Sequence, residues 1–404
     1  MISFHEAQTI LQQAAGHYAV ATEIRPVQDA VGRVCAEPVT SPINIQPFDN
    51  SAMDGYAVRL ADLAEATPET PQKLLKTQTI SAGSTHNLPP LKTGCCAHIM
   101  TGAPLPEGAE AVVPVELVTA EGENITFSAA PQHHANIRFA GEDMRAGDAL
   151  LAAGRIISVR DILPLATAGV ATVAVYKKTK VLFLATGDEL VSDLTQPLAT
   201  GQIYNSNMYY ATARLSEMGA DVKVLVLKDT PEDFQNVLAE HLPAVDMVVS
   251  SGGVSAGAFD FVRPGLEAMG ADILYHKIKI KPGKPNLLAR LPQNKLYFGL
   301  PGNPVATAVG LDLFVRPALK IITKTPLPHG QKAVITTSSE NKKPLSLFLK
   351  GYQYVADDGR QMVDVLDGQA SFMTASLLAA NCWVHLPEEH MANAGDVVDI
   401  YPFY

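Results

Sequence analysis

Four loops in the second half of the chain carry residues that can bind phosphates and a divalent cation. Each loop follows an apolar segment of strand length, and the loops are 186–189, 229, 251–257 and 301–304. In a parallel α/β sheet, such loops meet at the carboxyl ends of the strands, where ligands bind. Glycine-rich loops bring backbone N–H groups close to an anion, and carboxylates are suited to Mg²⁺. The sequence therefore predicts one binding site at this edge.

The residues selected for this edge are glycines, short polar residues and carboxylates. They are Gly187, Asp188, Glu189, Asp229, Ser251, Gly252, Gly253, Ser255, Pro301, Gly302 and Asn303. Each loop alone also fits ordinary turn chemistry, because adjacent glycines form tight turns and Asp229 can cap a helix that begins at Pro231. The expected convergence of four loops favours a binding site.

A run of four lysines forms a second signal. Lys277, Lys279 and Lys281 alternate with isoleucines, and Lys284 follows in a Pro-Gly-Lys-Pro turn. On a strand, alternate side chains share one face, so the three ammonium groups are expected side by side. Since the chain carries a net charge of −10, this cluster favours an anion site over a solvated strand face.

Alternating strands and helices must position these residues from about residue 180 onward, which indicates βαβ units and a mostly parallel sheet. The expected strands are 181–185, 222–228, 246–250, 273–281 and 296–300, and the expected helices are 206–218, 231–242, 260–269 and 304–323. Residues 1–20 read as an amphipathic helix. Residues 47–138 are rich in proline and predict a small β-rich unit. The short strands of 326–404 predict a small β-barrel or sandwich.

Composition excludes several other classes of protein. The chain has 404 residues, of which 47% are hydrophobic and 18% charged, so it is not wholly disordered. A general binder of nucleic acid or of anionic membranes needs a basic surface, which a net charge of −10 does not supply. The longest nearly apolar stretch, 162–176, is shorter than the roughly 20 residues of a membrane helix. Four cysteines without a Cys-x-x-Cys pair predict reduced thiols in the cytoplasm.

Seven motifs, taken in order, resemble those of the molybdopterin molybdotransferase family, which is called MoeA in bacteria and the E domain of gephyrin in animals. They are DNSAMDGYAV (49–58), IMTGAPLPEGAEAVV (99–113), GEDMRAGD (141–148), TGDEL (186–190), SGGVSAG (251–257), KPGKP (281–285) and GLPGNPV (299–305). The resemblance implies an α/β fold with additional β domains. The implied divisions are a helix and discontinuous linker (1–46 with 139–176), an inserted β-rich domain (47–138), an α/β domain (177–325) and a C-terminal β-barrel (326–404).

The resemblance also implies a reaction and its residues. Molybdate is joined to adenylylated molybdopterin, and AMP is released with the help of Mg²⁺. From the chemistry of carboxylates, we expect Glu189 and Asp229 to hold this Mg²⁺. The implied catalytic residues are Asp54, Thr101, Asp143, Glu189, Asp229 and Asp260. The implied molybdate-binding residues are Lys277, Lys281, Lys350 and Ser371. The sequence departs from the family pattern at three places. Lys350 stands where the family often has Arg, and Ser371 lies in a Gln-Ala-Ser stretch where the family has Gln-Gly-Ser. Ala258 stands where the family residue is often acidic.

The implied partners are a second copy of the chain, in a homodimer whose site lies between subunits, and a transient adenylyltransferase. Two other functions stay open. One is adenylylation of molybdopterin with ATP, although the regions outside the α/β domain would then have no role. The other is a binding or scaffold protein without catalysis, against which the presence of Asp54, Thr101 and Glu189 argues. Nothing in the sequence separates molybdate from tungstate.

Overall fold

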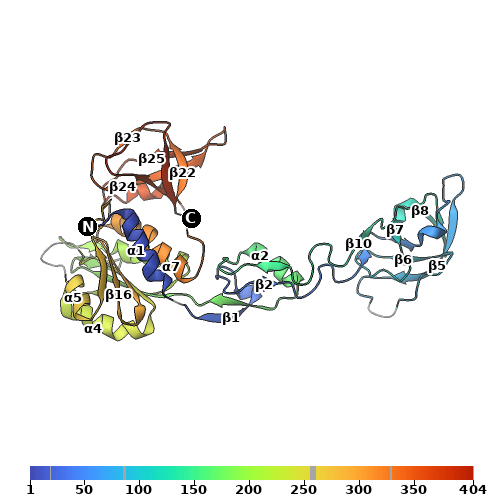
Figure 1. Cartoon of the computed structure of the whole chain (residues 1–404), viewed down its shortest axis with the longest axis horizontal. Helices are drawn as coiled ribbons and strands as arrows, with labels where there is room; N and C mark the ends of the chain where they lie inside the picture. Colours follow the sequence, from blue (N-terminus) through green and yellow to red (C-terminus); the bar gives the residue numbers. More distant parts are fainter. Residues whose placement is uncertain (19, 85–87, 255–260, 328–329, 404) are drawn as a thin grey trace.

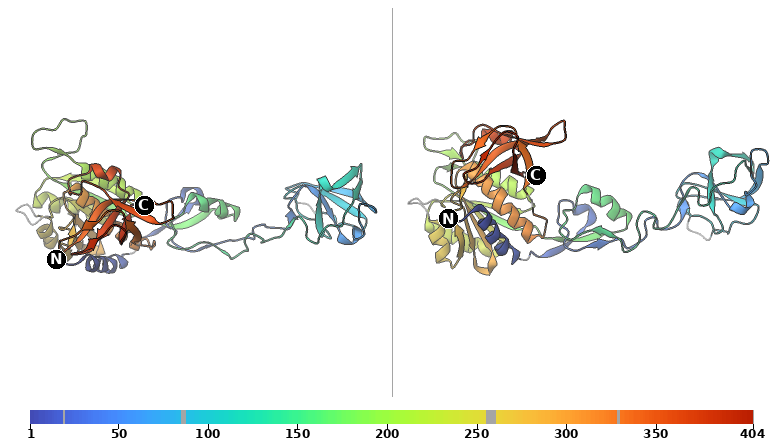
Figure 2. Two further views of the ribbon diagram at one scale, coloured as in Figure 1. Left: turned by 90° about the horizontal axis from the view of Figure 1, so that it is seen from above. Right: turned by 45° about the horizontal axis from the view of Figure 1, so that its top comes forward.

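The computed structural model describes residues 1–18, 20–84, 88–254, 261–327 and 330–403. The molecule is long, with an α/β part and a β-barrel packed together at one end and a separate β-sheet at the other (Figure 1). A narrow linker, formed by residues 22–51 and 137–176, joins the two ends. The further views in Figure 2 show the same separation. Residues of the two ends of one chain therefore lie far apart.

The α/β part is built on a six-stranded sheet. Its strands, in sheet order, are β16 (Asp221–Leu227), β13 (Lys180–Thr186), β17 (Met247–Ser251), β21 (Leu296–Leu300), β20 (Leu287–Arg290) and β18 (Asp272–His276). The first four are mutually parallel, and β20 and β18 run antiparallel to their neighbours. A small parallel pair, β14 (Leu190–Val191) and β15 (Ile203–Tyr204), lies beside the first loop. This architecture confirms the predicted α/β fold with additional β domains.

Helices cover both faces of this sheet because its strands are apolar on both sides. Side chains such as Val181 and Phe183 face one helical layer, and Leu182 and Leu184 face the other. The first layer consists of α1 (Phe4–Gly16), α3 (Ser206–Glu217), α6 (Pro304–Gly310), the π-helical segment η6 (Leu311–Val315) and α7 (Arg316–Ile322). The second consists of α4 (Pro231–His241) and α5 (Val262–Ala268). Continuous apolar runs of this kind are typical of buried parallel strands.

The C-terminal region forms a closed barrel, as the sequence predicts. Its strands, in order around the barrel, are β24 (Ser346–Val355), β25 (Gln361–Val365), β22 (Gln331–Ile335), β28 (Val397–Pro402) and β26 (Cys382–Leu386), and β26 pairs with β24 again. A short ladder joins β23 (Ser339–Glu340) to β27 (Met391–Ala392). β19 (Ile280–Lys281) comes from the α/β part and adds to β24. The barrel is therefore joined to the α/β part by backbone pairing.

The distal sheet lies at the other end of the molecule (Figure 1). Its strands, in order, are β7 (Ala111–Pro114), β4 (Gly55–Val58), β6 (Cys95–Ile99), β5 (Gln72–Ile80), β9 (Asn124–Phe127) and β8 (Val118–Glu121). Three antiparallel ladders connect the outgoing and returning chain: β1 (Thr22–Pro26) with β12 (Thr172–Tyr176), β2 (Val39–Thr40) with β11 (Ala149–Leu151), and β3 (Asn50–Ser51) with β10 (Ile137–Arg138). The helix α2 (Val159–Thr167) packs on the linker beside β2 and β11, as Figure 1 shows.

One predicted strand, 273–281, is wrong. The strand β18 ends at His276, and Lys277 has a φ of +73°, a left-handed angle that no strand residue adopts. The chain then passes to β19, which belongs to the barrel sheet. Lys277, Lys279 and Lys281 therefore do not share one strand face. The antiparallel strand β20 was not predicted from its short apolar run.

The parts of the chain that the structure describes contain no candidate membrane-spanning helix. None of the helices there has the length and apolar character that a bilayer requires.

Candidate functional site

The loops after four neighbouring parallel strands form the candidate site. β16, β13, β17 and β21 lie in this order, so their loops open side by side at the carboxyl edge. The side chain of Asn207, in the first turn of α3, joins two of these loops. Its Nδ2 donates to Ser251 Oγ and to the Gly302 carbonyl, both at 2.7 Å. Thr307 Oγ1 donates to the Pro301 carbonyl at 2.6 Å. The chain itself thus fixes the loops relative to one another.

Two glycines are required by the close packing of these loops. Gly252 has a φ of +102°, and a Cβ there would lie 2.7 Å from the carbonyl oxygen of Thr186. Gly187 has a φ of +149°, and a Cβ there would lie 2.8 Å from a carboxylate oxygen of Glu189. Residues with a side chain rarely adopt either backbone angle, and at Gly252 the clash with the Thr186 backbone adds to this requirement. Both positions therefore keep backbone at the edge of the sheet.

Three carboxylates gather at this edge. Asp188 and Glu189 follow β13 and are exposed, whereas Asp229 follows β16 and is partly buried. Burial, and then the negative charges of Asp188 and Glu189, raise the pKa of Asp229 above its usual range. Its Oδ1 is buried and has no hydrogen-bond partner among the described residues. A cation beside these groups would relieve both the repulsion and the unmet hydrogen-bonding demand.

The carboxylates suit a Mg²⁺ ion that protein and substrate bind together, rather than one enclosed entirely by protein ligands. In the described parts of the chain, no three His, Cys, Asp or Glu side chains come together in a way that could hold a metal ion. Mg²⁺ is usually held by one or two carboxylates together with phosphate oxygens of the substrate. The unpartnered oxygen of Asp229, with Glu189 nearby, supplies such a partial set.

A cavity of about 300 Å³ adjoins this edge, between the α/β part and the barrel. The polar side chains on its wall are Lys281, Lys284, Asn303, Lys343 and Ser371. Asn303 belongs to the loop after β21, so the cavity and the carboxyl edge share a wall. The Val305 N–H, at the start of α6, donates to the Ser371 carbonyl at 3.1 Å and holds the barrel loop in place. We refer to this space as the lysine cavity.

Two ammonium groups lie beside each other in the lysine cavity. The hydrogen-bond contact with Lys343, followed by burial, holds the pKa of Lys281 below its usual range. Repulsion between two cations is removed when an anion lies between them. The turn that carries Lys281 is itself closed by Asn286, whose side chain donates to the Gly283 carbonyl. The cavity therefore presents fixed positive charge to an oxyanion.

Two of the expected molybdate ligands are placed differently. Lys277 is not among the residues that line the lysine cavity, because its left-handed backbone turns the chain away from a regular strand. Lys350 is fully buried, and its ammonium donates to the carbonyls of Gly368 and Met373, the latter at 2.7 Å. Lys350 therefore supports the loop that carries Ser371 and does not itself face the cavity.

Asp54 and Thr101 form a pair in the distal sheet. Thr101 donates to Asp54 Oδ1 from its N–H at 2.7 Å and from its hydroxyl at 2.9 Å. These two hydrogen bonds, the backbone one first, lower the pKa of Asp54, so the carboxylate stays charged. Asp143 lies in the linker, where its N–H donates to the Ile45 carbonyl at 3.0 Å. Within one chain, the distal sheet and the linker are remote from the carboxyl edge (Figure 1).

Three residues considered at the sequence level lie outside the described residues. They are Ser255, Ala258 and Asp260.

Comparison with known proteins gives matches along the whole chain. Residues 2–169 match the "MoeA N-terminal region (domain I and II)", residues 182–321 a "Probable molybdopterin binding domain", and residues 332–403 the "MoeA C-terminal region (domain IV)". A Haemophilus influenzae protein named molybdopterin molybdenumtransferase is 37% identical over 395 residues, which cover 95% of this chain and 94% of that protein. The chain belongs to the MoeA family.

Further relatives agree with MoeA membership. A Bacillus subtilis molybdopterin molybdenumtransferase is 35% identical over 91% of this chain and 86% of its own length. The crystal structure of a molybdopterin biosynthesis MoeA protein from Pyrococcus horikosii superimposes with a TM-score of 0.87 at 26% identity, over 100% of this chain and 99% of the other. The resemblance found in the sequence motifs is thereby confirmed.

Two residues of the candidate site were not predicted from the sequence. Asn207 follows a short strand at the start of α3, and nothing local marks it as the residue that joins two loops. Lys343 lies in the barrel and meets Lys281 only because the barrel packs on the α/β part. Lys342 and Lys343 are adjacent in the sequence and form a visible basic pair, but the sequence does not indicate which of the two side chains faces the cavity.

Proposed function

We propose that this chain is a molybdopterin molybdenumtransferase that joins molybdate to adenylylated molybdopterin and releases AMP. The observation that carries the proposal is the pair Lys281 and Lys343 in a cavity that adjoins a glycine-rich, acidic sheet edge. The cavity suits a dianion, and the edge suits the phosphates of a nucleotide. Curated relatives with this name align over nearly the whole chain.

The residues divide the work between the two neighbouring spaces. Lys281 and Lys343 hold the molybdate dianion, and the Ser371 hydroxyl donates to one of its oxygens. The loop of Gly252 and Gly253 presents backbone at the edge where the pyrophosphate lies. Asn303, on the wall shared by both spaces, positions the molybdopterin end between them. Two reactants held in neighbouring sites react faster than two that must meet in solution.

The carboxylates at the sheet edge assist the release of AMP. Mg²⁺ bound by Glu189 and Asp229 would supply positive charge to the pyrophosphate whose bond to AMP breaks. The carboxylate of Glu189, which is exposed at the edge, would be one of the groups that hold this cation. Asp229, with its raised pKa, is the carboxylate that gains most from a nearby cation.

A second copy of the chain completes the site in this proposal. Asp54 and Thr101 are fixed to each other but remote from their own carboxyl edge (Figure 1). The outer face of α2 exposes Val159 and Leu163, one helical turn apart, each with 74% of its surface accessible. An exposed apolar stripe of this kind favours an interface. We propose a homodimer in which the Asp54 pair of one copy reaches the carboxyl edge of the other.

The setting proposed for the protein is the cytoplasm, where its four free cysteines stay reduced. An adenylyltransferase that makes the nucleotide substrate would pass it on through a transient contact.

Release of AMP from adenylylated molybdopterin tests the proposed function. With Mg²⁺ present, we expect AMP release that depends on molybdate and is lost in Glu189→Gln. The matched control is Glu240→Gln, which removes an exposed carboxylate from α4. Tight binding of the nucleotide without release of AMP would contradict the transferase and favour a scaffold. Consumption of ATP without molybdate would instead favour an adenylyltransferase.

A further inference from the structure

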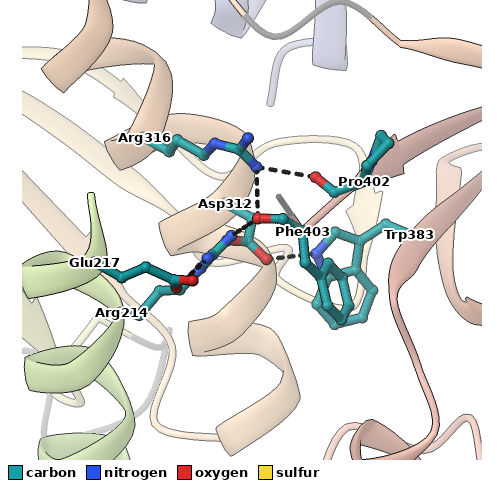
Figure 3. Close-up of polar contacts among 7 residues, drawn as sticks. All are labelled: Arg214, Glu217, Asp312, Arg316, Trp383, Pro402 and Phe403. Atoms are coloured by element: carbon teal, nitrogen blue, oxygen red, sulfur yellow. Dashed lines mark hydrogen bonds and ion pairs between the residues drawn. The ribbon is translucent and has the colours of Figure 1, made fainter. Parts of the chain in front are cut away.

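A second cavity, of about 390 Å³, lies at the opposite edge of the parallel sheet from the candidate site. Thr179 and Ala220 on its wall directly precede β13 and β16, so this is the amino edge. Three parts of the chain enclose it: the linker, the helices α3 and α7, and the end of the barrel at Phe403. We refer to this space as the junction cavity. Figure 3 shows one of its walls.

Positive charge is concentrated around the junction cavity. Its charged lining residues are six cations, Arg33, Lys177, Lys178, Arg214, Arg316 and Lys320, and one carboxylate, Glu217. The whole chain has a net charge of −10. A cluster of cations against such a background attracts an anion into the cleft that it lines.

Two of these cations are already paired. The guanidinium of Arg33 donates to Glu23 at 2.6 Å. Arg214 forms ion pairs with Asp312 and Glu217 (Figure 3). Their charges are balanced within the chain, and they form the walls of the cavity. They are not available to a ligand.

The remaining cations form no ion pair among the described residues, although the charges of Asp312 and Glu217 act on Arg316 from a distance. Arg316 donates only to the carbonyls of Pro402 and Phe403, at 2.9 and 3.2 Å (Figure 3). Lys320 is partly buried, and its pKa is lowered by burial and then by the charge of Arg316. Lys177 and Lys178 are exposed at the end of the linker and form no ion pair in the described chain. Arg316 and Lys320 are partly buried without an ion pair, so an anion between them would offset the cost of burying their charges.

The wall between these cations is apolar. Val34 and Ile156 line it from the linker, and Met218 and Leu319 line it from the helices. Pockets for small organic ligands combine a mostly apolar lining with a few polar groups, in volumes of about 300–1,000 Å³. The junction cavity has that size and that composition. It suits a small organic ligand that has one anionic group and a body able to pack against this apolar wall.

We propose that the junction cavity binds a small organic phosphate of nucleoside monophosphate size. The phosphate contacts Lys178, Lys320 and Arg316, and the organic part packs against the apolar wall. Lys178 lies at the end of the linker, and Arg316 and Lys320 lie on α7 of the α/β part. The bound ligand therefore fixes the orientation of the linker relative to the α/β part. The proposal does not depend on the proposed function, because it concerns the other edge of the sheet.

Calorimetric titration with three probes tests this site in the full-length protein. We expect AMP to bind, inorganic phosphate to bind more weakly, and adenosine not to bind. Lys320→Met and Lys178→Gln should each weaken AMP binding by about tenfold or more, since each removes a charged hydrogen bond. Lys92→Gln, which removes an exposed charge from the distal part of the chain, is the matched control and should have no effect. Lys178 is exposed, so its variant keeps the test valid if Lys320→Met fails to fold.

Binding of AMP at the carboxyl edge must be separated from binding at the junction. The titrations are therefore repeated with Mg²⁺ present in a Glu189→Gln background, which alters the carboxyl edge and leaves the junction cavity unchanged. A site that survives Glu189→Gln and is weakened by Lys178→Gln supports the proposal. If Lys178→Gln and Lys320→Met leave every AMP site unchanged, the proposal is overturned. Equal affinity for inorganic phosphate and AMP would overturn the assignment to an organic phosphate.

Discussion

Two adjacent lysines in the barrel provide a sharp contrast at the scale of the residue. Lys343 lines the lysine cavity, whereas Lys342 pairs with Glu340 at 3.0 Å. We expect Lys343→Gln to raise the KM for molybdate by about tenfold or more, because a charged hydrogen bond to the oxyanion is lost. The kcat at saturating molybdate should change less. Molybdate-dependent AMP release at varied molybdate concentrations gives both constants.

Lys342→Gln is the control for this prediction, since it removes the same charge from the same segment. It should leave the KM for molybdate unchanged. Equal increases in both variants would show that the general positive potential matters and that the position of Lys343 does not.

A buried histidine makes folding depend on pH. His385 stacks on Phe348 with ring centroids 4.9 Å apart, and neither of its ring nitrogens has a hydrogen-bond partner among the described residues. Burial, as the main cause, lowers its pKa from 6.5 to about 4. The folded state therefore favours the neutral ring. This stability is complete above pH 6.5 and is lost as the pH falls toward 4.

The expected loss at pH 5 is about 2 kcal/mol of unfolding free energy relative to pH 7 from this residue. His385→Phe keeps the aromatic stack and cannot be protonated, so its stability should fall less between pH 7 and pH 5. Urea unfolding of both proteins at the two pH values measures the difference. Identical losses in the two proteins would assign the pH dependence to other groups.

At the scale of the elements, the π-helical segment η6 joins the α/β part to the barrel. Asp312 on η6 accepts from Arg214 of α3 and, at 2.8 Å, from the indole N–H of Trp383 on β26 (Figure 3). We expect Asp312→Ala to lower the unfolding free energy by about 3–5 kcal/mol, because buried Arg214 loses its buried carboxylate partner and keeps only the exposed Glu217. Glu267→Ala breaks the exposed pair with Arg263 and should cost under about 1 kcal/mol. Urea unfolding measures both, and similar losses would contradict a special role for η6.

The elements that the sequence predicts well are those whose pattern is local. Continuous apolar runs such as 181–185 mark β13, and Gly219 marks the end of α3, because burial and backbone angle act within a few residues. The predicted strand 273–281 fails for a non-local reason. Its second half pairs with β24 of the barrel, and the turn at Lys277 serves that pairing.

The candidate site likewise contains residues that local sequence patterns predict and residues that they do not. The loops after β13, β16, β17 and β21 were predictable, since topology places them at one edge. The place of Lys343, the burial of Lys350 and the bridging by Asn207 all depend on how separate parts pack. Alternation of residue types in a sequence carries no information about such contacts.

At the scale of the whole molecule, the proposed site needs two chains, and mixing variants tests this. Glu189→Gln removes a residue of the carboxyl edge, and Asp54→Asn removes one of the distal pair. Each homodimer lacks one of these carboxylates at both sites and should be inactive. A mixed dimer has one site with both residues intact, so partial activity should return. AMP release after the two variants are unfolded together and refolded measures this recovery.

Refolding each variant separately and then assaying the two side by side is the control. If the mixture refolded together is as inactive as this control, a site shared between subunits is contradicted. So would appreciable activity in the Asp54→Asn homodimer.

The paired linker also bears on how such a chain can be divided by an engineer or by evolution. Ser51 and Ile137 are opposite each other in the last ladder before the distal sheet. Antiparallel partners keep their Cα atoms about 5 Å apart, so the ends left by excising the intervening segment already meet. A two-residue turn would close them. The distal sheet is thus a cassette with a single entry point, which can be removed, exchanged or inserted without a new path for the remaining chain.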